Sequence, residues 1–327
     1  MLKDNFGRIH DYLRISLTDK CNLRCTYCNP VDLPRGYFAG LPRMTAEEID
    51  TIASVFVNEG VKKIRLTGGE PLVRKDAKEI IELLSKYPVE LVITTNGVFV
   101  HEYIDTFKQA GIKSVNVSLD SLNRKTFFSI TGRDEFDRVI QNIELLLKDD
   151  FHVKINVVVM KNVNDCEIPD FMEWTRHQPV HVRFIEFMPF AGNNWINERV
   201  FSYKEMLKLI TSGYSFFKLP DDRNDTAKKY FVPEHKGTFA IISTMSEPFC
   251  SGCNRMRLTT DGKIKNCLFS KNEVDILGAL RKGENILPLI RQCVVNKEEA
   301  LGGQFDILDG AKDASKIQNR SMIDIGG

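Results

Sequence analysis

The feature that most constrains this 327-residue chain is an alternation of strand-like and helix-like segments over its first 190 residues. Strands that alternate with helices predict βα units and a parallel sheet. Six such units fit either a doubly wound sheet or an incomplete barrel. The expected strands are 12–17, 63–67, 91–95, 115–119, 153–159 and 182–187, and the expected helices include 46–58, 77–86, 104–110 and 136–148.

The loops that follow the expected strands carry unusual residues. In parallel α/β folds, chemistry is located at the carboxyl ends of the strands. Several such loops at the same end of successive strands predict one shared site along an arc. These loops contain three cysteines between Cys21 and Cys28, then Gly68-Gly69-Glu70-Pro71, Asn96-Gly97, Ser118-Leu119-Asp120 and Met188-Pro189.

The expected strands alternate polar and apolar residues, whereas buried parallel strands usually read as continuous apolar runs. One face of each strand must pack on helices, so the polar face points inward. An ordinary complete barrel fills its interior with branched apolar side chains. A polar interior therefore predicts a lumen open enough for a large polar ligand. The inward set includes Arg14, Ser16, Arg65, Asn116 and Lys154.

An alternative explanation of these inward charges is an internal salt-bridge network. Buried charges need partners, and Glu70, Asp120 and Glu186 are the carboxylates available for such a network. The two arrangements are not mutually exclusive at this stage.

The overall charge is too small to attract a polyanionic partner to the protein as a whole. Lys and Arg number 45, Asp and Glu 44, and the net charge is +1. Any polyanion must therefore bind a local cluster of cations, and we expect no nucleic-acid and no membrane partner. The start at Met1–Asp4 lacks the apolar region of a signal peptide, and no apolar run is long enough to span a bilayer. We expect a cytoplasmic protein.

Cys21, Cys25 and Cys28 place three thiols within eight residues. Soft thiolates bind iron–sulfur clusters, zinc or copper. A [4Fe–4S] cluster usually takes four cysteines, and no fourth lies nearby, so one iron would keep an open coordination site. A structural zinc site would instead be closed by a fourth Cys or His.

A second triplet, Cys250, Cys253 and Cys267, follows a polar segment at 220–237 that we expect to be a linker. A strand is expected at 238–243. Asp261-Gly262 between β-prone residues predicts a hairpin that places Met256 opposite Cys267 and returns Cys267 to Cys253. A zinc ribbon is the alternative, but it needs a fourth ligand. The predicted domains are residues 1–222 and 223–327.

The first triplet, with Tyr27 before its last cysteine and Gly-Gly-Glu-Pro after the second strand, resembles the radical S-adenosylmethionine (SAM) superfamily. The resemblance implies an α/β fold, an incomplete (βα)6 TIM-type barrel. It implies a [4Fe–4S] cluster whose open iron chelates the amino and carboxylate groups of SAM. One electron then cleaves SAM to methionine and a 5′-deoxyadenosyl radical. The implied SAM-binding residues are Tyr27, Gly69, Ser118 and Met188.

A narrower resemblance covers nearly the whole chain. The second triplet, Cys253 to Arg257, Asn193-Asn194-Trp195, Arg320-Ser321-Met322 and the final Gly326-Gly327 resemble the GTP 3′,8-cyclase family of molybdenum-cofactor biosynthesis. The resemblance implies a second [4Fe–4S] cluster in a C-terminal iron–sulfur module with a Gly-Gly tail. It also implies metal ligation by all six cysteines of the two triplets.

The implied reaction is radical cyclisation of GTP, the first step of molybdopterin biosynthesis. The 5′-deoxyadenosyl radical removes the ribose 3′ hydrogen, and the carbon radical adds to guanine C8. One electron and one proton, whose source the sequence does not reveal, then complete 3′,8-cyclo-7,8-dihydro-GTP. The implied GTP-binding residues are Arg14, Arg65, Thr94, Lys154, Arg255 and Arg257, and the implied catalytic residues are Arg255, Arg257, Gly326 and Gly327. We expect the guanine edge to bind the open iron of the second cluster, and the tail to enter the lumen.

Two other activities stay open at this stage. One is another radical SAM enzyme with an auxiliary cluster, such as a peptide-modifying enzyme, which usually has more cysteines in its C-terminal module. The other is an iron–sulfur electron carrier, which needs neither an open iron nor a polar lumen. Besides GTP, the expected partners are an electron donor such as flavodoxin or ferredoxin and a downstream pyranopterin-forming enzyme, and a homodimer is left open.

Overall fold

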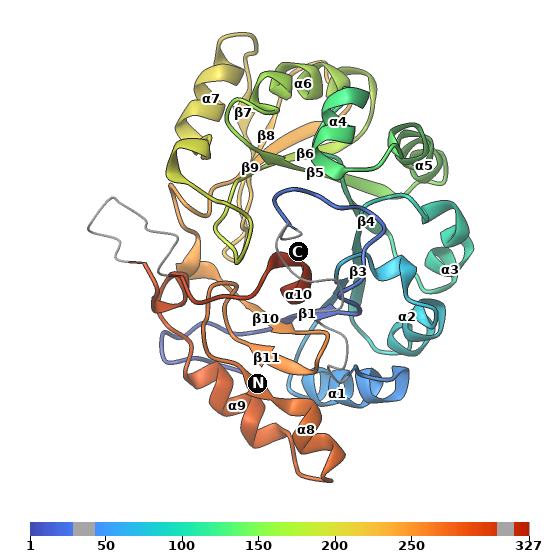
Figure 1. The fold of residues 1–327 in the computed structure, drawn as a ribbon, viewed down its shortest axis with the longest axis vertical. Helices are drawn as coiled ribbons and strands as arrows, with labels where there is room; N and C mark the ends of the chain where they lie inside the picture. Colours follow the sequence, from blue (N-terminus) through green and yellow to red (C-terminus); the bar gives the residue numbers. More distant parts are fainter. Residues whose placement is uncertain (29–42, 306–316, 327) are drawn as a thin grey trace.

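A single sheet organises the computed structural model, which describes residues 1–28, 43–305 and 317–326 (Figure 1). Its six central strands are parallel and follow the sequence order. This confirms the α/β class and the incomplete (βα)6 barrel, and each expected strand is correct to within one residue at either end. The strands are β1 (Tyr12–Ser16), β2 (Lys63–Thr67), β3 (Glu90–Thr95), β4 (Ser114–Ser118), β5 (His152–Val159) and β6 (His181–Glu186).

Helices cover the outside of the sheet, and the four expected ones are correct to within one residue. The first begins at a capping box, in which the Thr45 side chain accepts from Glu48 N and the Glu48 side chain accepts from Thr45 N. The helices are α1 (Ala46–Asn58), α2 (Ala77–Ser85), α3 (Ile104–Gln109), α4 (Arg124–Thr131), α5 (Phe136–Lys148), α6 (Ile168–His177), α7 (Tyr203–Thr211), α8 (Ile276–Arg281), α9 (Leu287–Val295) and α10 (Met322–Ile325).

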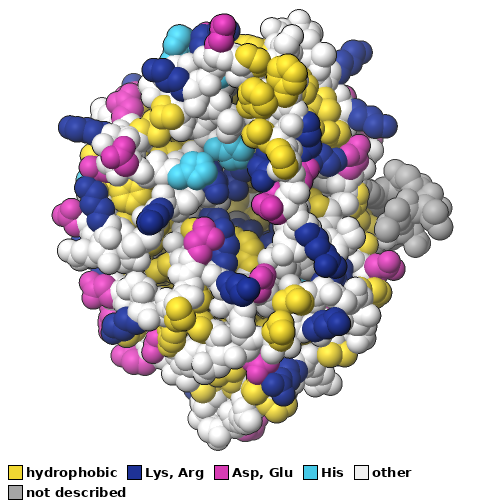
Figure 2. Space-filling view, turned by 180° about the vertical axis from the view of Figure 1, so that it is seen from behind, with side chains coloured by type: hydrophobic (Ala, Val, Ile, Leu, Met, Phe, Trp, Pro, Cys, Tyr) yellow, Lys and Arg dark blue, Asp and Glu magenta, His cyan; other side chains and the backbone are white. Residues whose placement is uncertain are grey.

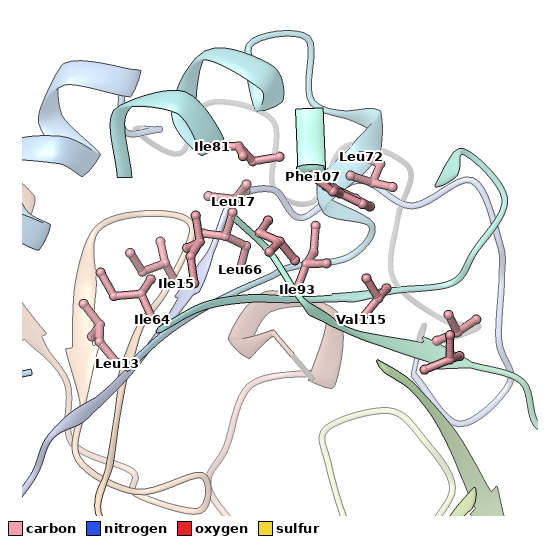
Figure 3. Close-up of a cluster of buried hydrophobic side chains, with 14 of the residues drawn as sticks. Leu13, Ile15, Leu17, Ile64, Leu66, Leu72, Ile81, Ile93, Phe107 and Val115 are labelled. Atoms are coloured by element: carbon pink, nitrogen blue, oxygen red, sulfur yellow. The ribbon is translucent and has the colours of Figure 1, made fainter. Parts of the chain in front are cut away.

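The main core lies between the outer face of the sheet and the helices (Figure 3). Leu13, Ile15 and Ile64 on the strands are fully buried, as are Ile81 of α2 and Phe107 of α3. Each fully buried side chain of this size contributes about 1.5–3 kcal/mol. The apolar residues of the alternating strands therefore face outward, which leaves their polar neighbours to face the interior of the barrel.

Segments after residue 216 extend the sheet at both edges. The strand β9 (Thr238–Ile242) pairs in parallel with β6, and β10 (Arg255–Leu258) pairs in parallel with β1. Beyond β9 lie β8 (Lys228–Phe231) and β7 (Phe217–Lys218), and beyond β10 lie β11 (Lys263–Lys265) and β12 (Val274–Asp275). The division at residue 222 stays a prediction, although strands from both sides of it share one sheet.

Two details of the C-terminal half differ from expectation. The segment 220–237, expected as a linker, contains β8, whose buried Tyr230 stacks on Phe239 at 5.0 Å between ring centroids. In the hairpin, Arg257 lies opposite Lys265, so the expected pairing of Met256 with Cys267 is wrong by one residue. The connection has three residues, 260–262, because Gly262 adopts a φ of +74° and closes it in the left-handed conformation.

Candidate active site

The polar inner face of the strands lines a cavity of about 600 Å³. Figure 2 shows a hollow in the back of the molecule with Lys, Arg and His side chains around it. The predicted lumen is thereby confirmed. Among the predicted ligand-binding residues, Arg14, Arg65, Lys154, Met188, Arg255 and Arg257 line this cavity, and so do Tyr12, Lys63, His152, His181, Arg183 and Lys229, which the sequence analysis missed.

The salt-bridge explanation of the inward charges is wrong. Glu70 accepts from Thr95 Oγ1 at 2.8 Å and from two backbone amides. Asp120 accepts from Tyr27 Oη and from a backbone amide, and Glu186 accepts from residues 203, 245 and 246. These carboxylates hold the strand ends and loops together, and no ion pair joins them to the cavity cations among the described residues.

Two of the cavity cations form ion pairs, Lys63 with Glu90 and Lys229 with Asp225. The arginines of the lining and Lys154 form none with the carboxylates of the described residues, and they repel one another. Arg14 Nε and Arg183 Nε are buried and have no hydrogen-bond partner within the described part of the chain. Burial, together with Arg183, Lys63 and Arg65, lowers the pKa of Lys154 to about 8. Burial and Arg255 lower the pKa of Arg257 to about 10. Buried cations of this kind are stable only beside an anion, so the cavity is suited to a highly charged anionic ligand.

Thr94 lies behind this lining. Its hydroxyl accepts from Arg65 Nη1 at 3.1 Å, and Arg65 Nε also donates to the Tyr12 hydroxyl. Thr94 is therefore placed to orient Arg65, and a direct contact with GTP stays a prediction.

The first cysteine triplet lies in the loop after β1, at the carboxyl end of the strands. Leu23 N donates to Cys21 Sγ at 3.4 Å, and Asn96 Nδ2 lies 3.7 Å from the same sulfur. All three cysteines are half-buried. Burial and the carboxylate of Glu70 raise the pKa of Cys21 to about 11, so a metal has to displace the proton on binding.

The Gly-Gly-Glu loop holds the cysteine loop in place. Gly69 N donates to Thr18 O at 2.6 Å, and Glu70 N donates to Lys20 O at 2.8 Å. A Cβ at Gly69 would lie 2.4 Å from Lys20 O, so only glycine fits this approach. The Gly69 amide is thus used within the protein, and a contact of Gly69 with SAM would have to come from its carbonyl oxygen.

The other residues predicted to bind SAM lie on three segments: Tyr27 within the first triplet, Ser118 at the end of β4, and Met188 just after β6. Tyr27 Oη donates to Asp120 Oδ2 at 2.7 Å, which fixes the ring next to Cys28. Ser118 is the last residue of β4. Met188 lines the large cavity and, like Tyr27, packs against a smaller apolar cluster that contains Phe187. Their positions are compatible with SAM binding, which stays a prediction.

The second triplet lines a separate small cavity of about 60 Å³. Arg255 and Arg257 line both cavities, so the two spaces adjoin. Burial raises the pKa of the Cys253 thiol, but Arg255 and Lys297 outweigh this effect and bring the pKa to about 6. Three thiols around one small cavity, one of them readily ionised, are suitable ligands for an iron–sulfur cluster.

Neither triplet is gathered tightly around one point. Within residues 1–28, 43–305 and 317–326, no three Cys, His, Asp or Glu side chains are arranged to hold a single metal ion. A cluster of several irons spaces its ligands more widely than one ion does.

The C-terminal tail lies inside the ring of strands, where Figure 1 shows α10. Gly326 has a φ of +80°, and a Cβ added there would meet Ser16 of β1 and Thr67 of β2. Arg257 Nη1 donates to Gly326 O at 2.9 Å. The expected entry of the tail into the lumen is confirmed as far as Gly326, while Gly327 lies outside the described residues.

Comparisons with known proteins agree with this site. The Radical SAM superfamily model matches residues 15–175, and the Molybdenum Cofactor Synthesis C model matches residues 180–302. The chain is 36% identical to the GTP 3′,8-cyclase of Listeria monocytogenes, over all of this chain and 99% of that protein. The chain belongs to the GTP 3′,8-cyclase family. SAM and iron–sulfur clusters, the cofactors expected from the sequence, are those of the radical SAM enzymes to which this family belongs.

Two further comparisons show how much of a longer relative the chain covers and which solved structure its fold resembles. The chain is 43% identical to molybdenum cofactor biosynthesis protein 1 of Dictyostelium discoideum over its full length, but it spans only about half (52%) of that relative. The fold of this GTP 3′,8-cyclase family member resembles the crystal structure of SuiB from Streptococcus suis, with a TM-score of 0.62 and 16% identity over 92% of this chain and 68% of SuiB. In the described residues, no helix is long and apolar enough to cross a membrane.

Proposed function

We propose that the protein uses SAM and two [4Fe–4S] clusters to cyclise GTP to 3′,8-cyclo-7,8-dihydro-GTP, the first step of molybdenum-cofactor biosynthesis. The observation that carries the proposal is a cavity of about 600 Å³ whose lining includes four cations without a carboxylate partner among the described residues, with the second cysteine triplet in an adjoining cavity. Family membership supports GTP as the substrate. It also argues against a peptide-modifying enzyme and an electron carrier.

The cavity cations bind the triphosphate. Arg14, Arg65, Lys154 and Arg183 project into the cavity from β1, β2, β5 and β6. Guanidinium groups form paired hydrogen bonds with phosphate oxygens, and these charge-assisted bonds are stronger than neutral ones. The triphosphate neutralises a set of cations that the protein itself leaves without counter-ions.

Arg255 and Arg257 orient the nucleoside. Because they line both cavities, a nucleotide held by the cations can place its base at the second triplet. Three cysteines leave one iron of a cluster open, and we propose that the guanine edge binds there, with C8 turned toward the ribose. Fixing the reacting groups in this way can lower a barrier by several kcal/mol, with about 7–11 kcal/mol reached in well-oriented intramolecular reactions.

Bound SAM, when reduced by the first cluster, supplies the 5′-deoxyadenosyl radical that abstracts the ribose 3′ hydrogen. The part of the protein in this step is to hold the ribose in place and to exclude water. We propose that Gly326, bound by Arg257 between β1 and β2, closes the lumen on this side. A side chain at this position would collide with Ser16 and Thr67.

The remaining predictions, which concern partners, oligomeric state and location, are also proposals. They are an electron donor such as flavodoxin or ferredoxin, a downstream pyranopterin-forming enzyme, a homodimer and a cytoplasmic location. Their support is the sequence resemblance described above.

The proposal is tested by following the abstracted hydrogen. Holoenzyme prepared without oxygen is incubated with SAM, dithionite and [3′-²H]GTP, and 5′-deoxyadenosine is analysed by mass spectrometry. We expect one deuterium in 5′-deoxyadenosine, and none from [2′-²H]GTP as the matched control. Formation of unlabelled 5′-deoxyadenosine at the same rate with and without GTP would contradict the proposal.

A further inference from the structure

Lys297 approaches the second cysteine triplet from within the protein. It follows α9, is only 4% exposed, and places Nζ 3.3 Å from Cys253 Sγ. The same ammonium donates to Arg255 O at 3.2 Å. Lys297 thus combines a hydrogen bond to the sulfur of a proposed cluster ligand with a hydrogen bond to the backbone of β10.

The charge of Lys297 lacks a carboxylate partner. No Asp or Glu of the described residues forms an ion pair with it, in contrast to nearby Arg8, which is paired with Asp4. The charge of Lys297 also acts on two other buried groups: with burial it lowers the pKa of His10 to about 4, and it opposes the effect of burial, which raises the pKa of Cys293. A buried ammonium without a counter-ion is costly, and the sulfur of Cys253 is the anionic group within its reach.

Lys297 does not belong to the substrate-binding surface. It lines neither the large nor the small cavity, whereas Arg255 lines both. Two of the cysteines differ in their hydrogen bonds within the described part of the chain, because Cys250 Sγ accepts from the neutral amide of Leu301 at 3.4 Å and Cys253 Sγ accepts from the ammonium of Lys297. The positive charge is therefore directed at one sulfur, from the side away from GTP.

We propose that Lys297 raises the reduction potential of the second cluster through this charged hydrogen bond to Cys253. Hydrogen bonds to the cysteine sulfurs and the net charge around a cluster tune its potential. A buried positive charge stabilises the reduced form, which carries one more electron. Lys297 is a positioning and tuning residue, and this inference rests on the proposed second cluster.

The test compares Lys297→Met, which removes the donor and the charge, with Lys297→Arg, which keeps both. Holoenzymes that contain both clusters are titrated anaerobically, and the reduced clusters are followed by electron paramagnetic resonance. The first cluster is recognised by its response to SAM. In Lys297→Met we expect the ratio of reduced to oxidised second cluster at a fixed potential to fall at least tenfold, which is a 59 mV lower midpoint for a one-electron couple. Lys297→Arg should behave as wild type, and the first cluster should be unchanged in both variants.

Iron content separates the other outcomes. If Lys297→Met loses the second cluster, the titration is made on Lys297→Gln, which keeps a neutral donor and should also show a lowered potential. Full iron with an unchanged potential, an equal drop in Lys297→Arg, or loss of the second cluster in both neutral variants would overturn the proposal and leave Lys297 as a structural support of the Cys253 loop. Wild-type protein that binds only one cluster would instead overturn the proposed function.

Discussion

The placement of the tail predicts a large effect from a single methyl group. Gly326 lies between β1 and β2 with a φ of +80°. A Cβ at this position would lie 2.8 Å from Thr67 Cγ2 and 3.1 Å from both Cβ and Oγ of Ser16. Gly326→Ala therefore introduces both a backbone strain and a steric overlap, and both are relieved when the tail leaves the lumen.

The two contributions can be added. A sparsely populated backbone conformation with positive φ costs a residue with a Cβ on the order of 1–3 kcal/mol, and overpacking of a well-packed site costs about 1–3 kcal/mol. Taking about 3 kcal/mol for the sum, the equilibrium constant for docking of the tail falls on the order of a hundredfold, because each 1.36 kcal/mol is a factor of about ten. The hydrogen bond from Arg257 Nη1 to Gly326 O is lost together with docking.

Hydrogen–deuterium exchange of the C-terminal peptide and GTP turnover measure the two consequences. The amide of Gly326 donates to Met322 O at 3.0 Å when the tail is docked, so undocking accelerates its exchange. Gly283→Ala is the matched control, since Gly283 has a φ of +75° and a Cβ added there would meet no atom within 4 Å. The control carries the backbone strain alone and should leave both the tail and turnover unchanged.

Wild-type exchange of the C-terminal peptide in Gly326→Ala would show that the lumen accommodates a methyl group there, and the packing argument would be refuted. Faster exchange with normal turnover would uphold the packing argument but show that the tail has no part in catalysis.

Four further outcomes are expected. Cys21→Ser should lower iron from about eight to about four per chain and abolish SAM cleavage, and cleavage that persists would show that the first triplet is not the SAM-binding cluster site. Cys267→Ser should lose GTP cyclisation but keep some uncoupled SAM cleavage, measured as 5′-deoxyadenosine. Lys154→Ala should weaken GTP binding in calorimetry by about 2–3 kcal/mol, the scale of a charged hydrogen bond, with SAM binding unchanged. Thr94→Ala removes the hydroxyl that accepts from Arg65 Nη1 and should cost about 1 kcal/mol, whereas a loss as large as that of Lys154→Ala would place Thr94 in contact with GTP.

The barrel and its lumen could be predicted because local rules govern them. Each strand of the wall packs one face on helices, so alternation alone assigned Leu13 outward and Arg14 inward. Arg183 obeys the same rule within an expected strand and could have been found. Thr94 also faces inward, but the longer Arg65 side chain lies over it, and the sequence does not reveal which of two inward residues reaches the ligand.

The arrangement of the C-terminal half could not be predicted in the same way. The pairing of β10 with β1 joins segments that are far apart in the chain, and neither segment carries a local signal for the other. The hairpin register depended on whether Gly262 closes a two-residue or a three-residue turn, and Asp-Gly is compatible with both. A sequence signal that could have indicated β8 is Tyr230, a large aromatic residue within a polar segment.

The pairing of β1 with β10 also has a consequence for the synthesis of the protein. Residue 16 leaves the ribosome roughly 240 residues before residue 258, and at about 5–20 residues per second the edge of β1 stays unpaired for roughly 12–50 seconds. After its own synthesis β6 also lacks its partner β9 until about 56 more residues are translated. In that shorter interval the nascent sheet exposes two edges on which other chains could assemble. Nascent chains of this protein should therefore depend on chaperones until the last quarter is translated, and truncations that end before β9 should aggregate.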